Sequence, residues 1–147
     1  MEQPYKEIVE VMNEAYEEFG LLISKETSKL DELNLSVQQE LILSYINKNK
    51  QTTANEISAN FNISKSAVSQ VLSKLEKQEI ICKTANPLNK REFFLKLGKK
   101  GKWYIERLQE LDEILIKKYY SKIDIKELQQ MTNTMKKINK IIRDSNN

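Results

Sequence analysis

Short polar and basic side chains recur along one face of residues 64–77, and side chains of these types bind nucleic acid. On a helix, that face would carry Ser64, Lys65, Ser66, Ser69, Gln70, Ser73, Lys74 and Lys77. Lysine, glutamine and serine donate hydrogen bonds to base edges and phosphates, and a short serine lets a helix approach the wall of the major groove. Ser64, Ser66 and the free amides of the first turn also suit a phosphate. The alternative is the solvated face of an ordinary amphipathic helix.

A second basic pair, Lys90 and Arg91, follows in the turn-rich sequence 86–91. This sequence lies between two β-prone runs, residues 80–83 and 93–97. A short hairpin with a basic tip, directly after a helix pair, predicts a winged helix. Narrow A·T-rich minor grooves attract arginine, so we expect the tip to enter a minor groove. The alternative is a surface hairpin whose lysine and arginine only confer solubility.

Two helices joined by a tight turn must position the polar face. Thr53 precedes Glu56 by three residues, a capping-box pattern that predicts a helix start at Ala54. Asn62 suits the turn because asparagine tolerates the left-handed conformation, and Ser64 is a favourable cap for the second helix. The core-facing stripe of that helix would be Val68, Val71, Leu72 and Leu75.

Another helix is predicted on each side of this unit. Ser36 and Gln39 repeat the capping-box pattern after a connection at residues 30–35. The helix they open would have on its inner side Leu41, Ile42, Tyr45 and Ile46. After the hairpin, Gly98 breaks the strand, and a long helix should run over residues 99–120. Its apolar positions are Trp103, Leu108, Leu111, Ile114 and Leu115.

Both ends of the chain carry apolar seams spaced alternately by four and three residues. The first seam is Tyr5, Val9, Met12, Tyr16, Phe19 and Ile23. The second is Leu128, Met131, Met135, Ile138 and Ile142, in a helix opened by Asp124 and Glu127. Heptad-like seams of this kind favour a core shared with a second chain. The alternative is burial within one subunit.

The net charge of +3 conceals a strong division along the 147 residues. The segment from Ser64 to Tyr104 has ten basic and three acidic side chains, whereas the segment from Met1 to Ile63 has five basic and eleven acidic ones. A local basic segment is the expected footprint of a surface that binds a polyanion.

Residues 36–101 resemble the MarR family of bacterial transcription factors. The matching pieces are NEISANFNISKSAVSQVLSKLEKQEII, the wing NPLNKRE, and FLKLGKKG opening a long helix. Asn89 stands where the family usually has an acidic residue that helps hold the wing arginine, and Glu79 stands where it has a glycine. The resemblance implies a mostly α fold, a winged helix-turn-helix domain with a small two-stranded wing between N- and C-terminal dimerisation helices. The corresponding ranges are 1–34, 35–99 and 100–147.

The same resemblance implies a homodimer that represses transcription from a pseudo-palindromic operator in double-stranded DNA. The expected DNA-binding residues are Ser64, Lys65, Ser66, Ser69, Gln70, Ser73, Lys74, Lys90 and Arg91. A small effector, aromatic or phenolic, would bind a crevice between the dimer helices and the DNA-binding lobe. Its expected walls are Tyr16, Phe19, Trp103 and Tyr104, and the alternative is that these four are ordinary core aromatics.

Composition argues against several other classes. The chain has no histidine and one cysteine, Cys82, which removes the usual transition-metal sites and any internal disulfide. We expect Cys82 to be a buried, inert thiol and expect no cofactor. The sequence contains no glycine-rich phosphate-binding loop of the kind that would indicate an enzyme. The acidic N-terminus is no signal peptide, and no apolar run is long enough to cross a bilayer, which predicts a cytoplasmic protein.

Three rival interpretations stay open. The first is a winged-helix module that binds another protein and never touches DNA, although the basic segment argues against it. The second is a redox-responsive regulator that uses Cys82. The third is a winged-helix repressor of another family with a different dimer.

Overall fold

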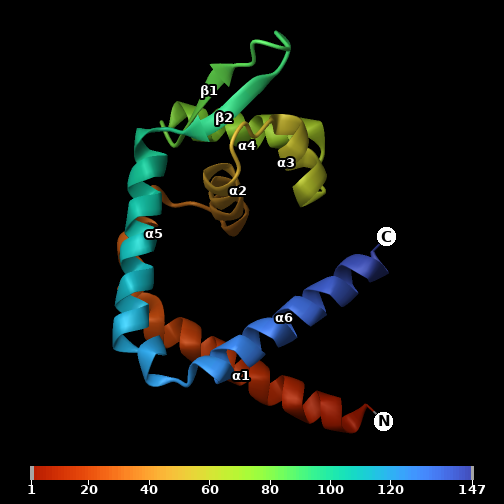
Figure 1. Cartoon of the computed structure of the whole chain (residues 1–147), viewed down its shortest axis with the longest axis vertical. Helices are drawn as coiled ribbons and strands as arrows, with labels where there is room; N and C mark the ends of the chain where they lie inside the picture. The colour runs from red at the N-terminus through yellow and green to blue at the C-terminus, as the bar shows by residue number, and fades with distance from the viewer. Residues whose placement is uncertain (1, 147) are drawn as a thin grey trace. The chain divides into compact units, whose positions relative to one another are not determined.

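The computed structural model describes residues 2–146, which form six α-helices, two short 3-10 helices and one two-stranded sheet (Figure 1). The elements are α1 (Gln3–Thr27), η1 (Ser28–Leu33), α2 (Val37–Lys48), α3 (Ala54–Phe61), α4 (Lys65–Lys77), β1 (Ile81–Ala85), β2 (Phe93–Leu97), α5 (Lys99–Lys118), η2 (Tyr120–Lys122) and α6 (Ile125–Ser145). The predicted mostly α class and the small two-stranded wing are confirmed. The chain divides into two compact units, and the boundary follows Gln109. The predicted domain limits at residues 34 and 99 stay a prediction.

The predicted caps set the starts of α2, α3 and α4. Ser36 and Gln39 form a reciprocal capping box, in which each side chain accepts a hydrogen bond from the backbone N–H of the other residue. Thr53 and Ser64 cap α3 and α4, and each side-chain oxygen accepts from the N–H three residues later. Asn62 ends α3 in the left-handed conformation, with φ of 48°.

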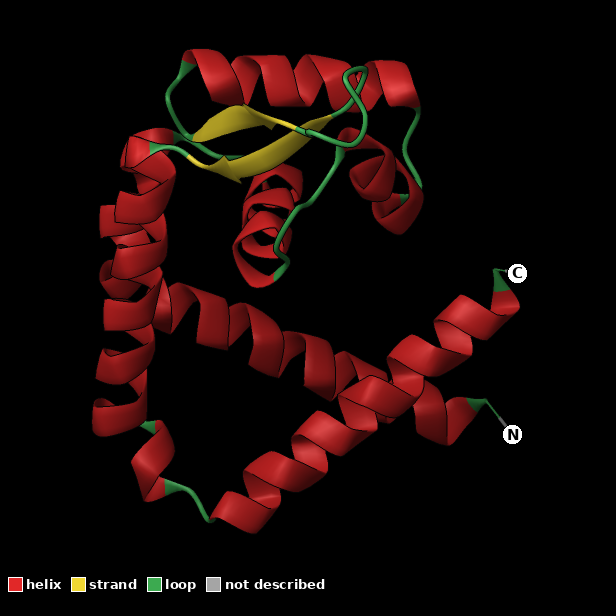
Figure 2. Ribbon diagram, turned by 45° about the horizontal axis from the view of Figure 1, so that its top comes forward, coloured by secondary structure: helices red, strands yellow, loops and turns green. Residues whose placement is uncertain are grey.

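The hairpin of β1 and β2 is antiparallel, with Ile81 opposite Leu97. Thr52 adds an isolated bridge beside β2, where the Leu95 N–H donates to the Thr52 carbonyl oxygen at 2.7 Å. Figure 2 shows the yellow strands lying between α4 and α2. The hairpin therefore packs against α2 and α4, and β2 also contacts α3.

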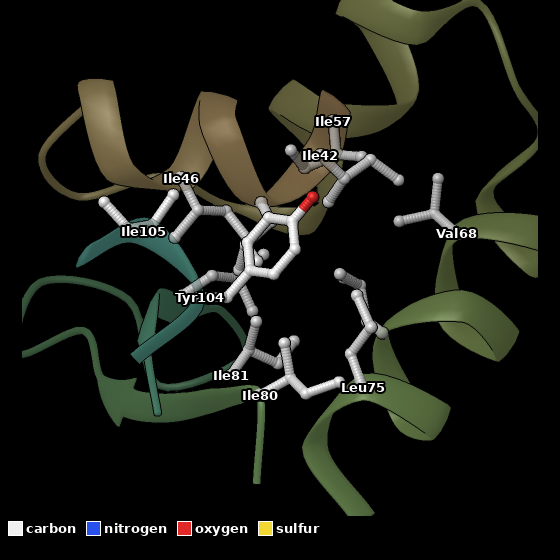
Figure 3. Packing of buried hydrophobic residues seen from close by; sticks show 12 residues of the cluster. Ile42, Ile46, Ile57, Val68, Leu75, Ile80, Ile81, Tyr104 and Ile105 are labelled. Atoms are coloured by element: carbon white, nitrogen blue, oxygen red, sulfur yellow. The ribbon is translucent and has the colours of Figure 1, made fainter. Parts of the chain in front are cut away.

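One cluster of buried side chains joins α2, α3, α4, the hairpin and the first turns of α5. Figure 3 shows the Tyr104 ring pointing into this cluster, near Ile42, Ile46 and Ile81. The buried members are Ile42, Leu43, Ile46, Ile57, Val68, Leu72, Leu75, Ile80, Ile81, Leu95, Tyr104 and Ile105. This core fixes α4 and the wing to one rigid base, because side chains packed at this density allow little relative movement.

The prediction for the inner side of α2 was partly wrong. Leu41 is 54% exposed, whereas Leu43, which is not among the predicted inner positions, is fully buried. The hairpin and α5 select the buried side of α2, and a short apolar run does not reveal where those neighbours lie. The predicted connection at 30–35 also has structure of its own, since Leu30 and Leu33 of η1 pack on the core.

The expectation of a buried thiol at Cys82 was also wrong, because this side chain is exposed. Side chains alternate along a strand, and Ile81 takes the inward position in β1. The neighbouring residue must then point outward, so Cys82 shares its face with its cross-strand partner Lys96.

The junction between α4 and α5 depends on close backbone contacts. Glu79 has φ of 60°, a left-handed conformation that glycine adopts freely and that is unfavourable for a glutamate. The first turn of α5 lies directly on the Glu79–Ile80 backbone, where the Gly98 N–H donates to the Ile80 carbonyl oxygen at 2.9 Å. A Cβ at Gly101 would overlap that same oxygen, so this position requires glycine.

The terminal helices α1 and α6 expose their seams. Within the described part of the chain, neither helix has a buried residue, and Met135, Ile138 and Phe19 are each close to half exposed. A core shared with a second chain stays a prediction, and burial within one subunit stays its alternative. Across residues 2–146, no helix has both the length and the apolar character needed to cross a membrane.

Candidate nucleic-acid interface

The outer face of α4 is polar, basic and fully accessible. Val68, Leu72 and Leu75 are buried on the inner side, which leaves the other side of the helix free. All seven predicted contact residues of this segment are exposed, namely Ser64, Lys65, Ser66, Ser69, Gln70, Ser73 and Lys74. The Ser64 oxygen is engaged as the helix cap and lies 3.2 Å from the Ser66 oxygen, so the other side chains of the face are the ones able to reach outward.

The wing tip is built from two consecutive turns that share Asn89. The Asn89 N–H donates to the Asn86 carbonyl oxygen at 3.2 Å, and the Glu92 N–H donates to the Asn89 carbonyl oxygen at 3.1 Å. In each turn the asparagine side chain also accepts from the N–H two residues later, that of Leu88 or Arg91, at 3.0 and 3.1 Å. Asn89 thus serves as an acceptor for the Arg91 backbone and, unlike an acidic residue, adds no negative charge at this position.

A hollow of about 310 Å³ connects α4 to the wing. Lys65 and Ser69 line it from α4, and Arg91 lines it from the wing. Glu92 also lines it, and the Asn55 side-chain amide donates to the Glu92 carboxylate at 3.5 Å, which links α3 to the base of the wing. The outer face of α4, called the recognition face from here on, and the wing therefore form one continuous surface.

A second hollow, of about 460 Å³, continues along α4 from the same Ser69. Its other linings are Gln70, Ser73, Lys74, Lys77 and Gln78. No carboxylate lines it among the described residues, so both charged groups are cations. A surface of amide, hydroxyl and ammonium donors is suited to base edges and phosphates in a major groove.

The structure places the nine predicted DNA-binding residues on this surface to different degrees. Six of the nine line the two hollows, namely Lys65, Ser69, Gln70, Ser73, Lys74 and Arg91. The other three, Ser64, Ser66 and Lys90, are exposed and line neither hollow. Sequence reasoning missed the linings Asn55 and Lys83. Asn55 lies on α3 and Lys83 on β1, so these two side chains reach the first hollow only through the packing of α3 and the hairpin beside α4.

The four expected crevice residues have different environments. Tyr16 and Phe19 of α1 are 51% and 44% exposed, and Trp103 is half-buried with the Arg107 guanidinium 5.8 Å from its ring centroid. Tyr104 is 2% exposed and donates from its hydroxyl to the Glu40 carboxylate at 3.0 Å. Burial raises the pKa of the Tyr104 phenol, and the bond to Glu40 raises that pKa further. Tyr104 thus serves the core, and the shared crevice stays a prediction.

Over residues 2–146, no three or more His, Cys, Asp or Glu side chains are grouped so that they could hold a metal ion.

Comparison with known proteins places the chain among DNA-binding regulators. The sequence profile described as "MarR family" matches residues 35–93. The HTH-type transcriptional regulator BilQ of Clostridioides difficile (strain CD3) is 33% identical over 102 residues, which are 65% of this chain and 67% of that protein.

Two solved structures extend the likeness to nearly the whole chain. Streptococcus pneumoniae FabT in complex with DNA is similar with a TM-score of 0.75 and 18% identity, over 95% of this chain and 98% of that one. Staphylococcus aureus MarR in complex with salicylate and kanamycin is similar with a TM-score of 0.69 and 26% identity, over 97% and 95% of the two chains.

Proposed function

Because this chain belongs to the MarR family of transcriptional regulators, we propose that it is a homodimeric repressor that binds a pseudo-palindromic DNA operator. In this proposal each α4 enters a major groove and each wing reaches the adjacent minor groove. Two copies related by a two-fold axis would read half-sites about one helical turn apart. The protein would act in the cytoplasm, where bacterial DNA lies.

The observation that carries this proposal is the continuous surface of α4 and the wing. Its two hollows meet at Ser69 and contain the cations Lys65, Lys74 and Arg91. The segment from Ser64 to Tyr104 has ten basic and three acidic side chains, so a polyanion is the partner that its charge favours. A module that binds only proteins has no need of this charge.

The dimer is supported by the exposed seams of α1 and α6. Helix α1 is 25 residues long and α6 is 21, and apolar faces of this length rarely remain in water on a monomer. The two helices also differ in charge, since α1 has two basic and six acidic side chains while α6 has five basic and two acidic ones. Opposite charges favour pairing of α1 with α6 of the partner subunit.

Release by a small aromatic effector is supported by a relative. Staphylococcus aureus MarR has been solved with salicylate, an aromatic acid. For this chain we propose a similar effector, bound near Tyr16, Phe19 and Trp103. Tyr16 and Phe19 are about half exposed on α1 and would be enclosed if a second chain covered that helix. A shift of the dimer helices by a few ångströms would move one α4 out of its groove.

The experiment that tests this function is a selection of genomic fragments with purified protein at two salt concentrations. We expect a pseudo-palindromic site, recovered more strongly at the lower concentration. The variant Gln70→Ala should recover a site with relaxed preference at one position in each half, because it removes one base-edge donor and acceptor. Recovery of no common site by the wild type would contradict the proposal.

A redox-responsive regulator is the second candidate function, and the exposure of Cys82 favours it. An accessible thiol on a wing strand can react with oxidants, and its product would change the surface next to Lys96. If this function holds, peroxide weakens operator binding by the wild type and leaves Cys82→Ser unchanged. Equal responses of the two proteins would exclude it.

A further inference from the structure

A hollow of about 780 Å³ at the base of the wing is separate from the α4 surface. It lies between the end of α2, residues 49–51, strand β2 and the first turns of α5. Lys50, Lys96 and Lys102 line it from three of these segments, and Ile46 and Leu95 lie among its apolar linings. Neither the recognition face nor the wing tip contributes a residue to this hollow.

Hydrogen bonds fix the backbone from which the three lysines extend. Thr52 is fully buried, and its hydroxyl donates to the Asn49 carbonyl oxygen at 2.9 Å. Its own carbonyl oxygen accepts from Leu95, which holds the segment of Lys50 against the strand of Lys96. The Lys102 N–H donates to the Gly98 carbonyl oxygen at 2.9 Å in the first turn of α5. The fold therefore places these three exposed lysines along the lining of one hollow.

Within residues 2–146, the charged side chains that line this hollow are all lysines. No carboxylate lines it, and none of the three lysines has an ion pair within residues 2–146. An adjoining hollow of about 800 Å³ also contains Lys102, but there three glutamates balance three lysines. Like charges gathered without partners repel one another and attract an anion of two or more negative charges.

We propose that this hollow binds a phosphate or pyrophosphate group. The group would belong either to a small phosphorylated molecule or to the DNA backbone, because both present the same oxygens to lysine. Its occupant would join residues 49–51 to β2, and β2 carries the wing. Binding here would therefore stiffen the base of the wing. The inference goes beyond the proposed function, since a small anion can occupy the hollow without an operator.

The test is a calorimetric titration of the protein with inorganic pyrophosphate in the absence of DNA. One variant carries Lys50→Gln, Lys96→Gln and Lys102→Gln. The control carries Lys25→Gln, Lys29→Gln and Lys122→Gln, which removes the same charge from exposed positions elsewhere. We expect the wild type and the control to bind pyrophosphate, and the hollow variant to bind it at least 10-fold more weakly.

A second arm measures the salt dependence of DNA binding with the same three proteins. If DNA alone supplies the phosphates, pyrophosphate binds none of the three proteins detectably, and the hollow variant alone loses up to about five units of the log–log salt slope, because a dimer carries six of these lysines. Equal behaviour of the two triple variants in both arms would overturn the proposal. A wild type that binds pyrophosphate but no DNA would refute the proposed function and leave this inference standing.

Discussion

At the scale of single residues, the wing arginine is the clearest test of a direct DNA contact. Arg91 is exposed, and its backbone N–H donates to the Asn89 side chain, which fixes the backbone from which the guanidinium extends. Arg91→Ala should weaken operator binding by about 1–3 kcal/mol, or roughly 5- to 150-fold, and change the free energy of unfolding by less than about 0.5 kcal/mol. Fluorescence anisotropy and thermal unfolding measure the two quantities.

The matched control for this prediction is Lys122→Ala, which removes one exposed positive charge from η2. Its operator affinity should stay within a factor of about two of the wild type. If Arg91→Ala binds as tightly as Lys122→Ala, the wing contact is refuted.

Tyr104 provides a second residue-scale prediction, on stability and pH. Tyr104→Phe removes the hydrogen bond to the half-buried Glu40 and should destabilise the fold by about 1.5 kcal/mol. The pKa of the phenol is raised in the folded state, so its contribution is complete below the unfolded pKa of about 10 and is lost as pH rises towards the folded pKa. The difference between wild type and variant should therefore shrink above about pH 10.

Urea unfolding at several pH values measures this difference, with Tyr120→Phe on η2 as the control. A difference that stays constant up to pH 12 would show that the Tyr104 phenol titrates equally in both states. No destabilisation at neutral pH would contradict the role of the hydrogen bond.

At the scale of the elements, the contact between α5 and the Glu79–Ile80 backbone sets the direction of α5. Gly101→Ala should destabilise the protein by about 1–3 kcal/mol, since the added Cβ overlaps the Ile80 carbonyl oxygen and outweighs the better helix propensity of alanine. Lys100→Ala, one residue earlier and exposed, should change stability by less than about 0.5 kcal/mol. Denaturant midpoints that are equal for the two variants would contradict the close contact.

The seam of α6 carries a prediction about assembly. Ile138→Asp would place a carboxylate in the proposed apolar interface and should raise the dimer dissociation constant on the order of 100-fold. Asn139→Asp adds the same charge one residue away and off the seam, and it should leave the dimer intact. Analytical ultracentrifugation distinguishes the two. A dimeric Ile138→Asp with normal operator affinity would remove α6 from the interface.

The elements whose limits were predicted well are those with local chemical signals. The caps Ser36, Thr53 and Ser64 mark three helix starts because their side chains bond to backbone groups only a few residues away. The exposed face of α4 was predicted from the helical spacing of the apolar residues on its opposite side. The burial of Leu43 and the exposure of Cys82 depend on neighbours distant in sequence, which is why these two assignments were wrong.

The candidate site was predicted in outline for the same reason. Lys65 and Ser69 could be predicted from their spacing along one face of a helix, and Arg91 from its place in a turn-rich segment. The linings Asn55 and Lys83 come from other elements, and no local pattern connects them to α4. Asn89 was visible only as a departure from the family pattern, and the structure gives its role as an acceptor for the Arg91 N–H.

At the scale of the whole molecule, charge and assembly serve the same function. In the proposed function, the basic segment from Ser64 to Tyr104 would supply the attraction to DNA, and the exposed seams of the terminal helices would bind a second copy. Such a dimer would double the number of phosphate contacts and fix the separation of the two recognition helices. We therefore expect sequence-specific binding to depend on both ends of the chain as well as on its centre.

The most direct test of this account is the binding of wild-type protein to its selected operator as salt is raised from 50 to 200 mM. With on the order of 6–10 phosphate contacts per dimer, affinity should fall by about 10³–10⁵, and two chains should bind each site. Absence of duplex binding even at the lower salt concentration, or binding by a single chain with no dependence on salt, would contradict the account.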